Sequence, residues 1–239
     1  MSKYKTLIFD LDDTLIDNKA SVDYAFEQIL HILHITPTED LLNKWLAFER
    51  DYWLAYESNQ LKLPTDFSKY GDKISYLRAK RFMIFFHRLN LSYEQALRIN
   101  TLYCDMLGVN IISIDKAIET LSELYSEFEL CVATNGPKEA ANNKLSKANL
   151  MKYIKTVVSS EEANHSKPNK EFFDYLFSKM SYKNKDGMLM IGDSLSTDVL
   201  GGMNNGLDTC WYNPRHRELP EKYKPTMTIT KLDQLKKLL

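Results

Sequence analysis

The first carboxylates of this chain stand directly after an apolar run, residues 7–9, which leads into Asp10 and Asp12. Side chains two residues apart on a strand lie on the same side, so both carboxylates would face whatever lies beyond the strand if it continues. Two such charges about 5 Å apart repel by roughly 3 kcal/mol at an effective dielectric of about 20. A metal ion, a lysine or a proton must neutralise them. An Asp-rich surface turn is the alternative, and the abrupt end of the apolar run disfavours it.

Polar residues also follow later apolar runs of the sequence or precede its helical patterns. If the apolar runs are parallel strands, their carboxyl ends meet at one edge of a sheet, where ligand sites lie. Their chemistry is complementary: carboxylates suit a divalent cation, a hydroxyl and backbone amides suit phosphate oxygens, and a lysine balances the remaining charge. Singly, a Thr-Asn-Gly turn is most often only a turn. Together these residues predict one site; they are Asp10, Asp12, Thr134, Asn135, Lys167, Asp193 and Asp198.

The pattern of helices and strands expected from the sequence predicts an α/β protein. From residue 113 onward, helical patterns alternate with short apolar runs, which predicts a Rossmann-like, mainly parallel sheet with helices on both faces. The expected strands after the first are 128–133, 156–158, 187–191, 209–212 and 227–229. Between the first strand and residue 113 the pattern is helical throughout. We therefore expect a core domain, 1–16 with 113–239, and an inserted α-helical domain, 17–112.

Aromatic residues dominate the inserted helical segment, and Trp45 is one of several at helical spacing. Core packing is the favoured interpretation, and a base-stacking surface is the alternative. Pro37 should end the first helix, and Thr38 can cap the next. Arg81 is expected to be a solvated surface charge, with a substrate contact as the alternative.

Composition bounds the setting of the protein. The 239 residues are 44% hydrophobic and 26% charged, with a formal net charge of −1, so no general field attracts nucleic acid or an anionic membrane. Cys131 and Cys210 lie inside apolar runs, which favours buried, reduced thiols and a reducing compartment, the cytoplasm. The apolar run near the N-terminus is too short for a signal peptide, and no stretch is long enough to span a bilayer.

Four motifs, in order along the chain, resemble those of the haloacid dehalogenase (HAD) superfamily, and the match covers nearly the whole chain. The helical segment between the first two motifs resembles the family's cap domain. The segment 209–218 is similar to the branch that hydrolyses pyrimidine nucleoside 5′-monophosphates. The motifs are Asp10-Leu11-Asp12-Asp13-Thr14, Thr134-Asn135-Gly136, Lys167-Pro168-Asn169, and Gly192-Asp193 through Asp198.

The resemblance implies a hydrolase of phosphoric monoesters. Asp10 would be the nucleophile that forms an aspartyl-phosphate, and Asp12 the acid and base that protonates the leaving alkoxide and then activates water. Mg²⁺ would be held by the Asp10 carboxylate, the Asp12 backbone carbonyl and Asp193, with Asp198 acting through water. The implied phosphate-binding residues are Thr134, Asn135 and Lys167.

The implied partner is a small phosphorylated metabolite, with a nucleoside monophosphate favoured over sugar phosphates. No nucleic-acid polymer and no membrane are expected, and the chain would act as a monomer or homodimer. The chain departs from the family pattern at 112–115, where the inserted segment returns to the core, and at 164–166, before Lys167; both departures bear on the choice of substrate. The alternatives are a sugar-phosphate phosphatase or phosphomutase, a dehalogenase, and a non-catalytic phospho-acceptor protein; the second acid, Asp12, argues against a dehalogenase.

Overall fold

The computed structural model describes residues 2–239, apart from the side chain of Glu57, and they form two compact units. One unit contains the residues up to Asn18 together with Ile111–Leu239, and the other contains Lys19–Asn110. The two stretches of chain at the junction are hydrogen-bonded to each other: the Asp17 amide donates to the Ile112 carbonyl at 2.8 Å.

A six-stranded sheet forms the centre of the first unit, in the order β3-β2-β1-β4-β5-β6, and every neighbouring pair of strands is parallel. The predicted parallel α/β fold is therefore confirmed. Each strand begins or ends within a residue or two of its apolar run, because an apolar run covered on both faces is the typical pattern of a parallel sheet. The strands are β1 (Thr6–Phe9), β2 (Glu129–Thr134), β3 (Thr156–Ser159), β4 (Met188–Gly192), β5 (Asp208–Tyr212) and β6 (Met227–Ile229).

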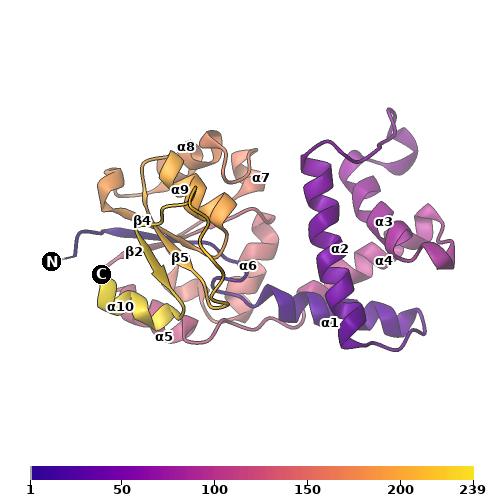
Figure 1. The fold of residues 1–239 in the computed structure, drawn as a ribbon, viewed down its shortest axis with the longest axis horizontal. Coiled ribbons are helices and arrows are strands. Elements are labelled where there is room, and N and C mark those ends of the chain that lie inside the picture. Colours follow the sequence, from indigo (N-terminus) through magenta and orange to yellow (C-terminus); the bar gives the residue numbers. More distant parts are fainter. Residues whose placement is uncertain (1) are drawn as a thin grey trace. The chain divides into compact units, whose positions relative to one another are not determined.

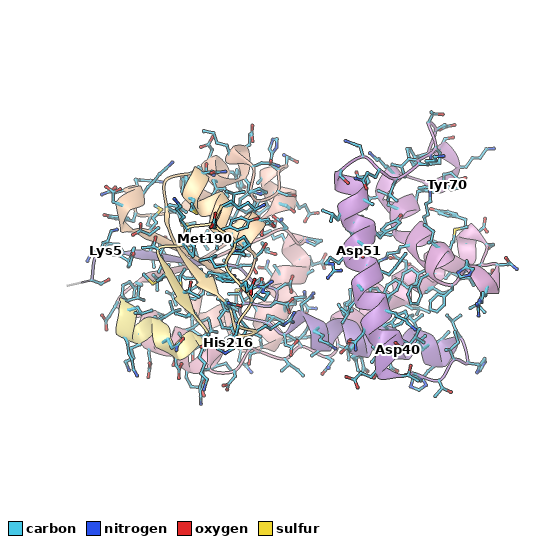
Figure 2. All side chains as sticks on the ribbon, in the orientation of Figure 1. Lys5, Asp40, Asp51, Tyr70, Met190 and His216 are labelled. Carbon is cyan, nitrogen blue, oxygen red and sulfur yellow. The ribbon has the colours of Figure 1, made fainter. Side chains whose placement is uncertain are left out.

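Helices cover both faces of this sheet, as predicted (Figure 1). Side chains alternate along each strand, so Leu7 and Phe9 pack with α5, α6 and α10 on one face. Ile8, and Met190 on β4 (labelled in Figure 2), pack with α7 and α8 on the other face. The helices are α5 (Ala117–Leu124), α6 (Lys138–Lys147), α7 (Ser160–Ala163), α8 (Lys170–Lys179), α9 (Leu200–Asn204) and α10 (Leu235–Leu238). Shorter turns are the 3₁₀ helices η3 (Met151–Tyr153), η4 (Lys185–Gly187) and η6 (Leu232–Gln234) and the π-helix η5 (Leu195–Val199).

The second unit is helical and has its own aromatic core. Trp45 is fully buried and stacks on Phe26 with the ring centroids 4.6 Å apart. Core packing is therefore the correct interpretation of Trp45. Thr38 caps α2 by accepting a hydrogen bond from the Leu41 amide, as predicted. The helices are α1 (Asn18–Ile32), α2 (Glu39–Glu57), η1 (Ser68–Tyr70), α3 (Lys73–Phe85), η2 (His87–Leu89) and α4 (Tyr93–Leu107).

The expectation that Arg81 is a solvated charge is wrong. Arg81 is 5% exposed, and its guanidinium pairs with the Glu49 carboxylate and donates to Asn100 Oδ1 at 2.9 Å. The Tyr103 hydroxyl donates to the same Glu49 carboxylate at 3.1 Å. A buried charge persists when a partner of opposite sign and further hydrogen bonds compensate its lost hydration, and α2 supplies that partner here.

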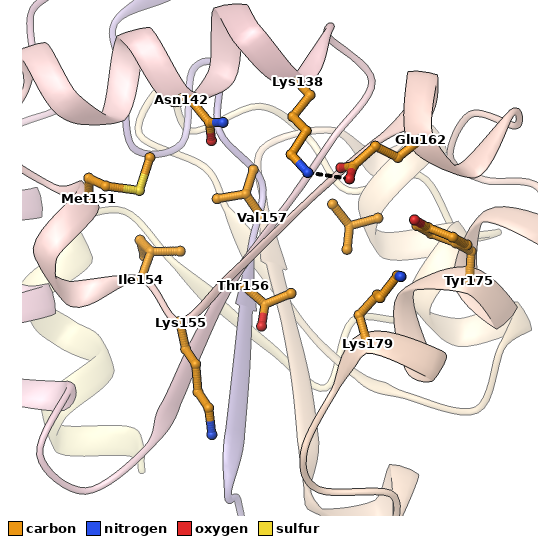
Figure 3. Close-up of a pocket in the computed structure, with 11 residues that line it drawn as sticks. Lys138, Asn142, Met151, Ile154, Lys155, Thr156, Val157, Glu162, Tyr175 and Lys179 are labelled. Atoms are coloured by element: carbon orange, nitrogen blue, oxygen red, sulfur yellow. Dashed lines mark hydrogen bonds and ion pairs between the residues drawn. The ribbon is translucent and has the colours of Figure 1, made fainter.

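The sheet ends at β3, and an open pocket of about 350 Å³ lies beside this edge strand (Figure 3). Lys138 and Asn142 line it from α6, while Tyr175 and Lys179 line it from α8. Within the described part of the chain, none of the predicted site residues contributes to its lining.

The cysteines of the first unit are buried, as predicted: Cys131 lies on β2 and Cys210 on β5, and both are free thiols. Cys104 in the second unit is also free, and it is exposed. Among the described helices, none combines the length and the apolar character needed to cross a bilayer.

Candidate active site

Three carboxylates meet beyond the carboxyl ends of two neighbouring strands. Asp10 directly follows β1, and Asp193 directly follows β4. These strands are paired in register, and the Asp10 amide donates to the Ile191 carbonyl at 2.8 Å, which brings the two chain ends side by side. Asp198, on the π-helix η5, completes the group: one carboxylate oxygen from each of the three aspartates lies within 4.8 Å of the others.

Lys167 places its ammonium group inside this acidic cluster. Its Nζ donates to Asp10 Oδ1, to Asp198 Oδ1 and to the Ala133 carbonyl, each at 2.7 Å. The lysine is only 3% exposed, so its three ammonium protons are all used inside the protein. The sequence assigns Asp198 to the metal alone; the structure adds this ion pair with Lys167.

Burial and charge act against each other at these groups. Burial lowers the pKa of Lys167, but the carboxylates of Asp10 and Asp198 raise it by more. The net effect is a pKa above the ordinary lysine value. Burial raises the pKa of Asp10 to about 8, although Lys167 opposes the shift. Burial likewise raises the pKa of Asp193 to about 7, with the Asp198 carboxylate adding to it. One ammonium group among three carboxylates leaves excess negative charge, which adds to the effect of burial on the pKa values of Asp10 and Asp193, while Lys167 stays charged.

Asn135 holds the backbone of Lys167 in place. Its side-chain oxygen accepts from the Lys167 amide at 2.8 Å, and its side-chain nitrogen donates to the Lys167 carbonyl at 3.1 Å. The hydroxyl of neighbouring Thr134, the last residue of β2, accepts from the Gly136 amide at 3.0 Å. This bond does not use the Thr134 hydroxyl proton. Asn135 is a positioning residue for Lys167 as well as a candidate phosphate ligand.

Asp12 lies outside the three-carboxylate group. Its carboxylate pairs with the ammonium of Lys144 from α6, and its side chain is 33% exposed. Next to it, Asp13 adopts a left-handed backbone with φ of 61° and accepts from the Asn18 amide at 3.2 Å, which confirms its interpretation as a turn and hydrogen-bonding residue. The left-handed turn aims Asp12 and Asp13 at different partners.

Three residues without a predicted role fix the backbone of Asp193. The Asp193 amide donates to the Thr14 hydroxyl at 3.1 Å, and its carbonyl accepts from Trp211 Nε1 at 3.0 Å and from the Arg217 guanidinium at 2.6 Å. Trp211 and Arg217 belong to the segment 209–218, which resembles the pyrimidine-nucleotidase branch, but no local pattern in the sequence shows that they reach Asp193.

Gly192 allows the close approach of the acidic groups. A β-carbon at this position would lie 2.2 Å from Asp198 Oδ2, far inside contact distance. That oxygen accepts from the Ser194 amide at 3.1 Å, while Oδ1 is held by Lys167. Both carboxylate oxygens of Asp198 are therefore occupied by protein donors.

The donor set fits a divalent cation of the Mg²⁺ type. Such ions prefer hard oxygen ligands, and they often keep several water ligands while one or two carboxylates bind them directly. Asp10 and Asp193 are suited to direct binding, whereas Asp198, with both oxygens engaged, is suited to binding through water. The excess of carboxylates over ammonium groups in the cluster is the charge that such an ion neutralises.

The fold and the site together define a Rossmann-like α/β protein with an acidic site at the carboxyl edge of its sheet: a buried aspartate follows a central strand, and a lysine and further acids surround it. The chain belongs to the haloacid dehalogenase-like hydrolases, whose family model matches residues 4–206.

Curated relatives are similar over nearly their whole lengths. The HAD-hydrolase YfnB of Bacillus subtilis is 30% identical over 98% of this chain and 95% of that protein. The pyrimidine 5′-nucleotidase YjjG of Escherichia coli is 27% identical over 99% of this chain and 98% of its own length. The pyrimidine 5′-nucleotidase PynA of Streptococcus pneumoniae is 28% identical over 95% and 91%, respectively.

A solved structure matches the whole fold. The crystal structure of YfnB from Bacillus subtilis, bound to magnesium, covers 100% of this chain and 99% of that chain, with a TM-score of 0.87 and 28% identity. That study describes an interdomain movement in YfnB.

Proposed function

We propose that this protein is a Mg²⁺-dependent phosphomonoesterase that works through an aspartyl-phosphate. The observation that carries the proposal is the buried Asp10 carboxylate held 2.7 Å from the Lys167 ammonium, beside two further acids at the same edge of the sheet. A nucleophilic carboxylate needs such positive charge because it must approach an anionic phosphate.

In the first step, Asp10 attacks phosphorus. Lys167 holds Oδ1, so Oδ2 is the oxygen that forms the new bond to phosphorus while the ester P–O bond breaks. Asp12 gives a proton to the departing alkoxide, which leaves as an alcohol. Thr134 and Asn135 donate hydrogen bonds to the transferring phosphoryl oxygens, and Lys167 neutralises part of their charge.

In the second step, water attacks the aspartyl-phosphate. Asp12 now takes a proton from that water, the bond between phosphorus and Asp10 breaks, and the Asp10 carboxylate is regenerated as inorganic phosphate forms. The same residue acts first as acid and then as base, so it must stay within hydrogen-bond reach of the reacting oxygens in both steps.

A Mg²⁺ ion would be held by the Asp10 and Asp193 carboxylates and the Asp12 backbone carbonyl, and Asp198 would act through water. A bound Mg²⁺ would supply positive charge for the phosphate oxygens as the transition state forms. We assign the catalytic role to residues 1–16 and 113–239, because every proposed site residue belongs to them, and a substrate-selecting cap role to 17–112.

The favoured substrate is a pyrimidine nucleoside 5′-monophosphate. Two relatives, YjjG and PynA, carry that activity in their names, and they match nearly the full length of this chain. The segment 209–218 resembles the same branch. Two of its residues, Trp211 and Arg217, donate hydrogen bonds to the backbone carbonyl of Asp193.

The decisive experiment is a panel of phosphomonoesters assayed by phosphate release with Mg²⁺ and with a chelator. The panel contains pyrimidine and purine monophosphates, small sugar phosphates and p-nitrophenyl phosphate. We expect Mg²⁺-dependent turnover, with the highest kcat/KM on UMP, dUMP or dTMP. Preference for a sugar phosphate would overturn the substrate assignment. An absence of turnover on every ester would overturn the proposed phosphomonoesterase activity.

A further inference from the structure

Lys144 on α6 reaches the proposed proton-transfer residue from outside the acidic cluster. Its ammonium group pairs with the Asp12 carboxylate and donates to Asn18 Oδ1 at 3.4 Å. The lysine side chain is 15% exposed, although it carries a full charge. A side chain that gives up most of its hydration and rotamer freedom to reach two partners is more than a surface charge.

We propose that Lys144 is a positioning residue that holds the Asp12 carboxylate in place for proton transfer. The proposal rests on the proposed function of Asp12 as acid and base. Lys144 touches neither the acidic cluster's three carboxylates nor their lysine in the described contacts, so it acts on the reaction through Asp12.

The loop that carries Asp12 explains why its side chain needs an external partner. The backbone is well determined, because the Leu15 and Ile16 amides both donate to the Leu11 carbonyl and the Asp13 amide donates to the Ile16 carbonyl. These bonds fix the position of the Asp12 Cα but leave the side-chain torsions free. A third-exposed carboxylate can rotate into water, and an ammonium partner restrains it.

The same lysine ties this loop to the start of the next helix. Asn18 is the first residue of α1, its amide donates to Asp13 Oδ1, and its side chain accepts from Lys144. Lys144 therefore joins two points of the segment that runs from the acidic loop toward the helical unit. The position of Asp12 is thereby linked to the conformation at the beginning of α1.

The position of Lys144 on α6 is suited to this task. The helix follows the Thr134-Asn135-Gly136 turn, and Ala141 and Leu145 bury its inner face against the sheet. Lys144 itself is not part of that apolar face, so its replacement leaves the packing of α6 intact. Proton transfer is sensitive to geometry, and a misplacement of about 1 Å can cost about 10²-fold in rate.

The test compares Lys144→Met, which keeps the aliphatic stem, with Lys144→Arg, which keeps the charge. Lys138→Met is the matched control, because Lys138 lies on the same helix and pairs with Glu162 away from Asp12. On a nucleoside monophosphate, we expect kcat of Lys144→Met to fall by about 10- to 100-fold with KM changed by less than about twofold. Lys144→Arg should recover most of the loss, and Lys138→Met should behave as the wild type.

A chromogenic ester separates positioning from a structural effect. p-Nitrophenolate leaves without protonation, so its release needs no acid, while hydrolysis of the aspartyl-phosphate still needs Asp12 as base. Lys144→Met should therefore show a rapid burst of about one equivalent of nitrophenolate followed by slow turnover. A merely structural defect would reduce the burst and the steady state together, and that result would overturn the proposal.

A double-mutant cycle with Asp12→Asn identifies the residue through which Lys144 acts. If Lys144 works through Asp12, adding Lys144→Met to Asp12→Asn should change the hydrolysis rate of the intermediate by less than about twofold. Additive losses would overturn the inference, as would an unchanged kcat in Lys144→Met. Normal activity in Asp12→Asn would instead reject the proposed function of Asp12, so the two failures are distinguishable.

Discussion

Asp10 and Lys167 are separated by 157 positions in the chain, yet Asp10 Oδ1 and Lys167 Nζ lie 2.7 Å apart in a buried site. Asp10 follows the central strand β1, while Lys167 lies between α7 and α8 and is held there by the side chain of Asn135. The contact fixes the orientation of the carboxylate and supplies positive charge beside it, which are the two requirements of an anionic nucleophile that attacks phosphate.

Asp10→Asn should abolish turnover while the fold persists. The amide is isosteric but a poor nucleophile, so we expect kcat to fall by about 10⁴-fold or more. Phosphate release measures the loss, and thermal unfolding checks the fold. Asp174→Asn, at an exposed aspartate on α8 that pairs with Lys170, is the control and should keep full activity. Near-normal turnover in Asp10→Asn would reject this residue as nucleophile.

Lys167→Met should lose both activity and stability. The substitution leaves the carboxylates of Asp10 and Asp198 without their ammonium partner, and breaking a buried ion pair in this way costs about 3–5 kcal/mol. Urea unfolding in the presence of a chelator measures the loss. Lys170→Met is the control, since that ammonium is exposed and its pair with Asp174 contributes about 1 kcal/mol or less. Equal stabilities of the two variants would contradict the buried pair.

Mg²⁺ should stabilise the wild-type protein in the absence of any substrate. A ligand that binds only the folded state at about 100 times its Kd adds about 2.7 kcal/mol to the free energy of unfolding. Asp193→Asn removes one carboxylate of the cluster and should reduce this gain, which thermal unfolding at several Mg²⁺ concentrations measures. The observation that would count against the site is an equal Mg²⁺-dependent shift in Asp193→Asn and in the wild type.

Gly192→Ala should disturb the site from within the sheet. The added β-carbon would lie 2.2 Å from Asp198 Oδ2, so Asp198 must move and its contact with Lys167 is strained. We expect a loss of about 1–3 kcal/mol in stability, as for overpacking in a core, together with reduced kcat. Gly136→Ala is the comparison for stability, because its added carbon would meet Thr134 Oγ1 at an ordinary 3.4 Å. A fully stable, active Gly192→Ala variant would contradict this close approach.

Arg81→Met should destabilise the helical unit in a pH-dependent way. Burial raises the pKa of Glu49, and Arg81 is the charge that opposes this shift. Removing Arg81 raises the pKa further, so the folded state then binds a proton that the unfolded chain has lost. Stability of the variant should therefore fall as pH rises above the ordinary Glu value and through the raised one.

Urea unfolding of Arg81→Met between pH 5 and pH 8 measures this effect, with a loss of about 3–5 kcal/mol expected at the upper end. The double variant Arg81→Met with Glu49→Gln is the control, since it carries no buried charge at this pair and should lose the pH dependence. A loss in Arg81→Met that is independent of pH would show that Glu49 is not the cause.

Much of the architecture follows from local patterns in the sequence. The apolar runs that become β1, β2 and β4 each end at a polar residue, so both the strands and the candidate positions Asp10, Thr134 and Asp193 can be identified without coordinates. The reason is that strand formation and burial depend on the character of a few consecutive residues, and the parallel arrangement then places the carboxyl ends at one edge.

The partners of these residues were decided by the tertiary structure alone. Lys144 forms an ion pair with Asp12, Arg217 donates to the Asp193 carbonyl, and buried Arg81 forms an ion pair with Glu49. Nothing in the sequence near either member of these pairs indicates the other. Each contact depends on how strands are ordered or helices packed, and so joins side chains from distant segments. Periodicity along the chain determines which face of a helix or strand is buried. The partner of a charged side chain on that element is determined by the neighbouring element in the fold.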